Sequence, residues 1–404
     1  PMTERLRVAT HDTFRSFDSR NFRLFFSGQI VSQAGTWMQS VAIVWVVLDL
    51  TGSGLALGLV TAAEFLPILL LGAWAGVITD RVDRHRMMLA TQGAFLALAF
   101  TLSALTLTGN ATVPALFALS LVFGTINAFD NPSRRALVVE LVGEDDVPNA
   151  VGLNSALMTG SRVVGPALAG LLIAGPGAGV AFAVNTVTYV AVIAALARMD
   201  RSQLRAAPRV AKAKGQLRQG FRYVWRTPDL RLPLIMVAVI GMLAFNYQVS
   251  LPLIAERTFG GTATTFTLLF ATMSLGSVAG ALLVARQTDL GLGFLLRAGT
   301  GLAVSSFALA LAPTLLLAFL ASLAVGFTNV LIISGANAVV QLRAAVLMRG
   351  RVLALLSVVF LGSTPIGSPI IGFVAEELGP RAAVGLGGVA TALAVAWTAH
   401  QVRA

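Results

Sequence analysis

Long, continuously apolar stretches alternate with short polar connections along the whole chain. Most contain about 20 residues or more, the length that a helix rising about 1.5 Å per residue needs to cross a hydrocarbon core about 30 Å thick. A transmembrane β-barrel would instead alternate apolar and polar residues at every second position. The pattern therefore predicts an all-α polytopic membrane protein with twelve transmembrane helices, at residues 22–49, 55–78, 87–108, 114–138, 147–174, 179–198, 230–254, 262–285, 291–312, 314–340, 352–374 and 381–400.

One long polar segment, Arg198 to Arg231, divides these spans into two groups of six. It is rich in arginine and lysine and contains no apolar stretch long enough to span a membrane. We therefore expect three regions: an N-terminal six-helix bundle at 1–200, a basic cytoplasmic linker at 201–229 and a C-terminal six-helix bundle at 230–404.

The two groups of spans also look like copies of each other. The stretch "LVFGTINAF", beginning at Leu121, matches "LAVGFTNVL", beginning at Leu323, and this match places Gly124 over Gly326. Because each copy has an even number of spans, both copies enter the membrane from the same side. Two parallel, pseudo-symmetric bundles around a central site are an architecture of secondary transporters.

Charged residues are scarce and unevenly placed. They make up 12% of the chain, against roughly 25% in soluble proteins. Alternate loops hold most of the lysine and arginine, which predicts a multi-pass protein of the bacterial cytoplasmic (inner) membrane with both termini in the cytoplasm. Topology and contact with the lipid bilayer then explain the net charge of +11, and nucleic acid is not an expected partner.

The stretch "GVITDRVDRHRMM" crowds six ionisable side chains into seven positions of an otherwise apolar region. It resembles the loop between spans two and three of the major facilitator superfamily, G-x-x-x-D-R/K-x-G-R-R/K. The matching residues are Gly76, Asp80, Arg81, Arg84 and Arg86, with Asp83 in place of the second glycine. Aspartate tolerates the left-handed backbone of a tight turn. The resemblance covers the whole chain and implies the major facilitator fold.

In this family the charged loop is a gate latch on the cytoplasmic face. The resemblance implies that Asp80 faces the N-terminal end of span eleven, where exposed N–H groups favour a carboxylate. It also implies that Arg84 reaches a carboxylate at the inner end of span four, for which Asp130 is the candidate. Exposed ion pairs contribute only about 0–1 kcal/mol each, so such a latch biases an alternating equilibrium without locking it.

Span five contains "GSRVVGPALAG", which is similar to the glycine–proline motif of the family's antiporters. The residues in its positions are Gly160, Gly165, Pro166 and Gly170. Close helix packing through small residues is the alternative explanation of this motif. Other stretches, such as "AFDNPSRRALVVELV" and "NAVGLNSALMTG", resemble the enterobactin-exporter-like branch, which includes multidrug and macrolide efflux proteins.

Polar side chains inside spans are costly in lipid and usually face a cavity or another helix. In span one, Gln29, Gln33, Thr36 and Ser40 recur on one helical face, with Trp37 beside them. The further candidates for substrate binding are Asn127, Asn131, Asn154, Met158, Asn246, Tyr247, Asn329 and Asn337. For each residue, hydrogen bonding between helices is the alternative role. Amides, aromatic rings and methionine suit a small amphipathic substrate.

Coupling to protons requires a titratable group at membrane depth. Glu64 in span two is the candidate proton carrier, and Arg162 in span five is its candidate counter-charge. A static ion pair between these two residues is the alternative, in which case coupling would lie elsewhere, for example at Asp130.

The sequence therefore predicts a secondary active exporter that moves a drug-like compound or a siderophore out of the cytoplasm by alternating access. The expected energy source is proton antiport, with no cofactor or metal, and the expected state is a monomer. No nucleotide-binding loop or catalytic motif occurs in the sequence, which predicts that the protein is not an enzyme. The alternatives are a lipid or lysolipid transporter of the same fold and a non-transporting receptor or scaffold.

Overall fold

The computed structural model describes residues 14–205, 216–287, 290–346 and 348–403. Within these ranges the chain is helical and contains no strand. Twelve helical segments of the described chain are long and apolar enough to cross a membrane. The predicted all-α fold with twelve spans is therefore confirmed.

The first six spans follow a short 3₁₀ turn and run as six uninterrupted helices. They are α2 (Arg20–Thr51), α3 (Gly54–Arg81), α4 (Arg84–Leu107), α5 (Val113–Glu140), α6 (Val147–Ala174) and α7 (Ala178–Ala197). The last six spans are α9 (Pro228–Leu243) with α10 (Tyr247–Leu253), then α11 (Ala263–Arg286), α12 (Leu292–Ala310), α13 (Leu315–Arg343), α14 (Arg349–Glu377) and α15 (Pro380–Arg403).

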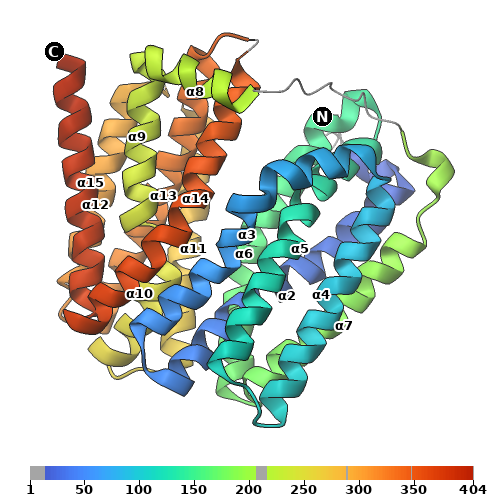
Figure 1. Ribbon diagram of the computed structural model, residues 1–404, viewed down its shortest axis with the longest axis horizontal. Coiled ribbons are helices and arrows are strands. Elements are labelled where there is room, and N and C mark those ends of the chain that lie inside the picture. Colours follow the sequence, from blue (N-terminus) through green and yellow to red (C-terminus); the bar gives the residue numbers. More distant parts are fainter. Residues whose placement is uncertain (1–13, 206–215, 288–289, 347, 404) are drawn as a thin grey trace, which may run out of the picture.

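These helices form two bundles, which lie side by side and are both seen along their length in Figure 1. Matching glycines pack in matching ways: a Cβ at Gly124 on α5 would touch the backbone of Glu64 on α3, and a Cβ at Gly326 on α13 would touch the backbone of Met273 on α11. The aligned positions thus make equivalent helix contacts in the two halves, as the predicted parallel repeat requires.

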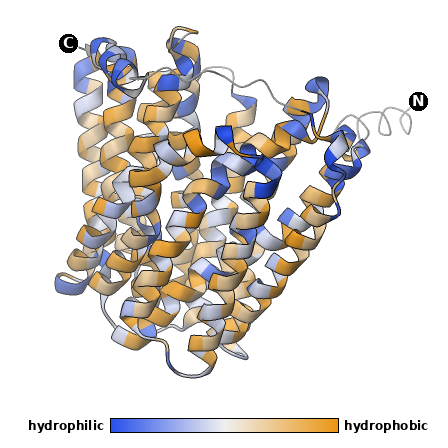
Figure 2. Ribbon diagram, turned by 45° about the vertical axis from the view of Figure 1, so that its right-hand side comes forward, coloured by the Kyte–Doolittle hydropathy of each residue, from blue (hydrophilic) through white to orange (hydrophobic). Residues whose placement is uncertain are grey.

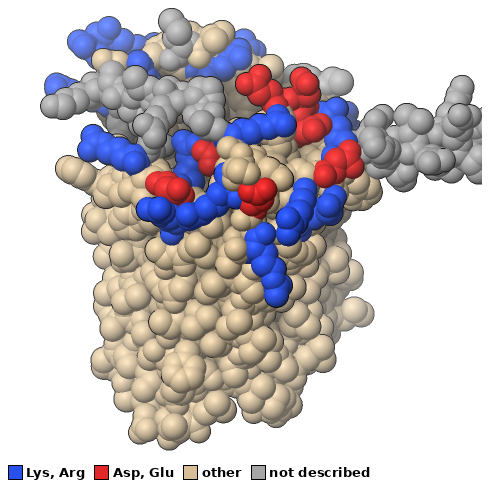
Figure 3. Space-filling model, turned by 90° about the vertical axis from the view of Figure 1, so that its right-hand side faces the viewer, with Lys and Arg blue, Asp and Glu red and all other residues tan. Residues whose placement is uncertain are grey.

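The surface separates into an apolar wall and a charged end. Hydrophobic residues cover the sides of the bundles in Figure 2, and large side chains such as Trp74 and Leu171 are 72% exposed there. Lysine, arginine and acidic side chains gather at one end in Figure 3. We call this end, where α3 meets α4 and α5 meets α6, the basic face, and the opposite end the far face. The wall identifies a multi-pass membrane protein.

Tight turns at the far face explain the very short connections in the sequence. Gly52 ends α2 with a φ of 61°, a left-handed conformation that glycine adopts without strain. Ser53 then caps α3, its side chain accepting a hydrogen bond from the amide of Ala56 at 3.2 Å. The chain therefore reverses between two spans within a few residues.

Span seven is broken, whereas its apolar sequence predicts a continuous helix over 230–254. Helix α9 ends at Leu243 and α10 begins at Tyr247. The side chain of Asn246 accounts for the break, since it donates to the Met242 carbonyl at 2.7 Å and accepts from the Ser368 hydroxyl at 2.8 Å. Polar groups freed by the break thus find partners inside the protein, as they must at membrane depth.

The connection between the halves contains a helix, α8 (Gln216–Arg226), that the polar sequence does not reveal. Gly220 and Val224 are buried, and Gly220 lies against α14, where its Cβ would approach the Cβ of Arg351 to 3.1 Å. Phe221 and Trp225 are exposed and stacked on each other. Helix α8 therefore covers the basic end of α14.

Candidate functional site

A cavity of about 380 Å³ lies between the two bundles. Small-molecule sites commonly have volumes of about 300–1,000 Å³. All six spans of the first bundle contribute to its lining, together with the α9–α10 break, α11, α13 and α14 of the second. A molecule bound here would contact both halves.

The polar face of α2 forms one wall of the cavity. Gln33, Thr36 and Ser40 line it, with Trp37 beside them, as predicted from their spacing. Gln29 does not reach the cavity, and its prediction as a substrate contact is wrong. It is fully buried and accepts a hydrogen bond from the Gln33 amide at 3.1 Å, so it holds Gln33 in place.

Most of the other predicted contacts are found at the cavity. The lining includes Asn127, Met158, Asn246, Tyr247 and Asn329. Asn154 and Asn337 are absent from the described lining, and their predictions as contacts are wrong. Asn154 precedes Met158 by one turn on the same face of α6, and the described lining begins on this helix at Met158.

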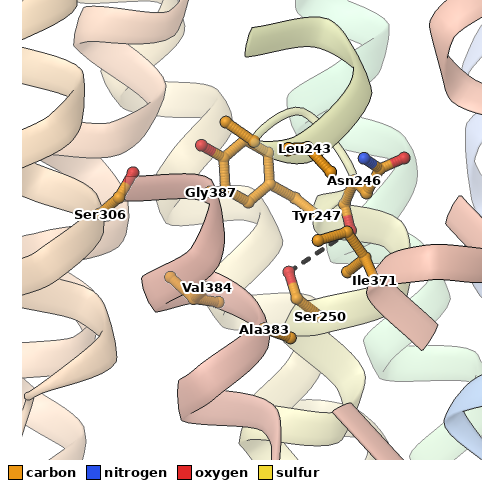
Figure 4. Close-up of a pocket in the computed structure, with 10 residues that line it drawn as sticks. Leu243, Asn246, Tyr247, Ser250, Ser306, Ile371, Ala383, Val384 and Gly387 are labelled. Carbon is orange, nitrogen blue, oxygen red and sulfur yellow. Dashed lines mark hydrogen bonds between the residues drawn. The ribbon is translucent and has the colours of Figure 1, made fainter. Parts of the chain in front are cut away.

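Tyr247 also borders a second, much smaller cavity inside the C-terminal bundle, of about 10 Å³. In Figure 4 its hydroxyl points toward Ser306 of α12, and Ser250 bonds back to the Asn246 carbonyl at 3.4 Å. The hydroxyl of Tyr247 is thus directed into its own bundle. The atoms of Tyr247 that line the central cavity are therefore ones other than its hydroxyl group.

Several lining residues were missed from the sequence. They are Gln92, Tyr189, Gln248 and the phenylalanines at positions 95, 123, 245, 270 and 360, whereas Asn131, which also lines the cavity, was predicted. Tyr189 bonds to Thr36 at 2.9 Å, and Asn131 donates to Asn127 at 2.9 Å. Gln92 and Tyr189 are polar positions inside spans and satisfy the same criterion as the predicted residues. The phenylalanines carry no such signal, because every span contains apolar side chains.

Two charged side chains, Glu64 on α3 and Arg162 on α6, line the cavity from the two sides of α2 without pairing with each other. Glu64 accepts a hydrogen bond from Ser40 at 3.5 Å. The guanidinium of Arg162 lies over the Trp37 ring, 5.2 Å from its centroid. The described residues show no ion pair between Glu64 and Arg162, so the alternative of a static pair is not what the structure shows. Both side chains instead contact α2: Glu64 contacts Ser40, and Arg162 contacts Trp37.

Asp130 is fully buried and held within the N-terminal bundle. It forms an ion pair with Arg134 one turn along α5 and accepts hydrogen bonds from Thr91 and Gln92, each at 2.8 Å. This arrangement favours a structural role for Asp130.

Arg84 pairs with Glu140 and not with Asp130. Both residues of this pair lie at the basic face, with side chains 12% and 13% exposed. Asp130 is ten residues earlier on the same helix, about 15 Å deeper at 1.5 Å per residue. The predicted partner was therefore too deep for Arg84 to reach, and the pair ties α4 to α5 within one half.

The charged loop is built around a helix cap. Asp83 precedes α4 and accepts from the Arg86 amide at 2.9 Å, with a φ of −58°. The left-handed turn expected at this position is therefore wrong, and capping explains the aspartate instead. Arg81 and Arg86 are exposed at the basic face, and Gly76 lies within α3. The side chain of Asp80 lies outside the described part of the structure.

The glycine–proline motif of α6 packs helices closely. A Cβ at Gly165 would approach the Ala34 carbonyl of α2 to 2.7 Å, and one at Gly170 would lie 3.0 Å from the Cβ of Thr267 on α11. Pro166 is buried between them, and Gly160 has open space around it. The alternative explanation, tight packing, is therefore what the structure shows for Gly165 and Gly170.

A second set of close helix contacts joins α3 to α14 in the halves of these helices nearer the far face, and we call it the seam. A Cβ at Gly58 would lie 2.9 Å from both the Pro369 Cα and the Ser368 carbonyl carbon. A Cβ at Gly54 would lie 2.6 Å from the Gly372 carbonyl oxygen. Together with the contact of Gly170 on Thr267, this seam joins the two bundles on the far side of the cavity.

Hydrogen bonds close the same end. Glu376 at the end of α14 accepts from the Ser53 hydroxyl at 2.6 Å and from the Leu55 amide at 2.9 Å. Arg257 donates to the carbonyls of Gly52 and Ala375. We call this group the far-face clasp. On the other side, the cavity lining extends toward the basic face as far as Arg135, near the end of α5.

Twelve spans in two parallel bundles around a shared polar cavity define the major facilitator fold. The family model described as transmembrane secretion effector matches residues 11–403, and the chain belongs to this family of the major facilitator superfamily. Its members are transporters, which confirms the prediction that the protein is not an enzyme.

Similar proteins agree with this assignment. The chain is 25% identical to the staphyloferrin A transporter of Staphylococcus aureus over 264 residues, which cover 65% of this chain and 66% of that protein. It is 26% identical to the multidrug efflux pump Tap of Mycolicibacterium fortuitum over 389 residues, 89% of this chain and 90% of that one. A bacterial homologue of the human lysosomal transporter Spinster, in an inward-facing and occupied conformation, has the same fold, with a TM-score of 0.72, 15% identity and coverage of 96% and 97%.

Proposed function

We propose that the protein is a secondary active exporter, which moves small amphipathic molecules such as drug-like compounds or siderophores out of the cytoplasm by alternating access. The observation that carries this proposal is the central cavity. Both halves line it, and the seam and the far-face clasp close it at the far face. With the basic face in the cytoplasm, as the arginine distribution favours, this is the inward-facing state of an exporter that awaits its substrate.

The lining supports an amphipathic substrate. Side-chain amides from both halves alternate with phenylalanine rings and methionine around the cavity. Such a surface offers apolar contact area with a few polar groups that fix orientation, which is typical of small-molecule sites. A staphyloferrin A transporter and a multidrug efflux pump among the similar proteins support the same substrate range.

Glu64 is our candidate for proton coupling. Among the described residues that line the cavity, it is the one carboxyl group. Its hydrogen bond comes from a hydroxyl group, Ser40, and no guanidinium is fixed against it, in contrast to Asp130. A carboxyl group in this setting can gain and lose a proton as the cavity changes sides.

The test uses purified protein in vesicles with an imposed proton gradient. Glu64→Gln is expected to abolish stimulation of transport by the gradient while exchange of substrate for substrate continues, because exchange needs no net proton movement. Asp49→Asn, at the exposed end of α2, is the matched control and should behave as the natural chain does. Gradient-driven transport that survives Glu64→Gln would remove Glu64 from the coupling mechanism.

A further inference from the structure

Arg162 presents an uncompensated positive charge to the central cavity. Its guanidinium contacts the Trp37 ring, and within the described chain no carboxylate lies within ion-pair distance of it. No hydrogen bond to another described residue uses its N–H groups, and its side chain is exposed to the cavity. A guanidinium stays charged at any pH a protein experiences, so this site lacks a counter-ion.

The other charged residues of the cavity do not neutralise the positive charge of Arg162. Four residues of the types that carry charge near neutral pH line the described cavity: Glu64, Arg134, Arg135 and Arg162. Arg134 is neutralised by Asp130. Arg135 and Arg162 therefore face Glu64 alone, and the lining carries excess positive charge whether or not Glu64 is protonated. Such a field attracts anions into a cleft with apolar walls.

The geometry around Arg162 favours one shape of ligand. The guanidinium of Arg162 lies over the Trp37 ring, and its N–H donors form no hydrogen bond with another described residue. An arginine edge matches the two oxygens of a carboxylate. Phe270 of α11 also lies beside Trp37, with ring centroids 6.4 Å apart. An oxyanion at Arg162 would thus place its apolar body beside aromatic rings of the second half.

We propose that the preferred substrates are amphipathic carboxylates, whose oxyanion binds Arg162 and whose apolar body lies between Trp37 and the phenylalanines of the C-terminal bundle. This assignment rests on the proposed export function and narrows its substrate class. The ligand would bridge the halves at the aromatic contact between α2 and α11, so binding is positioned to influence how the halves move against each other.

The test compares three probes of one skeleton: biphenyl-4-carboxylate, biphenyl-4-carboxamide and 4-aminomethylbiphenyl. Equilibrium binding of each tritiated probe is measured on the full chain in nanodiscs, with empty nanodiscs as the blank. Hydrogen bonds to charged groups contribute about 1.5–3 kcal/mol, which corresponds to about tenfold or more in affinity. The carboxylate should therefore bind about tenfold or more tightly than the other two probes.

Substitutions then assign the effect to one side chain. Arg162→Gln should lose about tenfold or more of the carboxylate affinity while changing the carboxamide affinity little, and Arg162→Lys should recover much of the loss. The control is Arg286→Gln, which removes an exposed charge outside the cavity. Equal binding of all three probes, or undiminished carboxylate binding by Arg162→Gln, would overturn the proposal.

The two proposals fail in different ways. Binding of the carboxylate through Arg162 without any translocation in vesicles would retain the anion site and refute export. Translocation of cationic and neutral compounds that is unaffected by Arg162→Gln would retain export and refute the anion site.

Discussion

Replacing Gly58 with alanine should push the conformational equilibrium away from the state seen here. Gly58 lies in the seam of α3 with α14, and the added Cβ would meet the Pro369 Cα and the Ser368 carbonyl carbon at 2.9 Å. Non-bonded carbon atoms prefer roughly 3.5–4.0 Å, so the two helices must separate by roughly 0.6 Å or more. The obstructing atoms belong to the backbone and cannot rotate aside.

The size of the shift follows from this overlap. Overpacking of a close contact costs about 1–3 kcal/mol. In the proposed alternating-access cycle the seam exists in the state closed at the far face and separates when that face opens, so the cost would fall on one state only. A difference of about 1–3 kcal/mol changes an equilibrium constant about 5- to 150-fold in favour of the outward-open state.

Distance measurements on spin-labelled protein can detect this change. The natural sequence contains no cysteine, so Asn110→Cys and Leu311→Cys place labels at the far face, one in each half. Gly58→Ala should enlarge the fraction of long far-face distances. Gly72→Ala is the matched control on the same helix, because a Cβ there would meet no atom within 4 Å. If both alanine variants give the distribution of the natural glycines, the seam does not govern closure.

Three further predictions follow from contacts in the two halves. A hydrophilic thiol reagent should label Thr36→Cys, which lines the cavity, far faster than Gln29→Cys, which has no exposed surface, and equal rates would contradict the cavity wall assigned to α2. Glu140→Gln removes the counter-charge of the partly buried Arg84 guanidinium, which should cost about 1–3 kcal/mol. Thermal unfolding should begin several degrees earlier than in the exposed control Glu144→Gln, and identical melting curves would refute the contribution of this pair. Glu376→Gln weakens the far-face clasp and should enlarge the same long-distance population as Gly58→Ala by a smaller amount; an unchanged population would show that the clasp contributes nothing to closure.

The spans and their repeat could be predicted because lipid imposes a simple rule on the sequence. Every backbone group in the membrane must be bonded internally, so apolar stretches of helical length mark the spans directly. The same rule made the polar face of α2 visible, since Gln33, Thr36 and Ser40 could not be left against lipid. It does not say whether a polar side chain meets water or another helix, and this is why Gln29 and Asn154 were assigned to the cavity wrongly.

Contacts between helices were less predictable, because they depend on how far each helix is shifted along its neighbour. The family pattern indicated an acidic partner for Arg84 near the end of span four, and two carboxylates on that helix were available. The predicted partner, Asp130, lies too deep in the membrane, and Glu140, just beyond the predicted end of span four, is the residue that pairs with Arg84. The break at Asn246 was hidden for a related reason, because its hydrogen bond to Ser368 comes from a helix more than a hundred residues away.

Proton-driven transport by the reconstituted full chain tests the central claim most directly. Vesicles with a proton gradient imposed across the membrane would be given a siderophore, a macrolide, a lysolipid and the three biphenyl probes, and accumulation would be followed over time. Our account predicts that small amphipathic compounds accumulate against their gradient, that a protonophore stops this, and that Glu64→Gln removes the dependence on the proton gradient. The account would be contradicted if no compound accumulated above its level in protein-free vesicles, or if accumulation did not depend on the proton gradient.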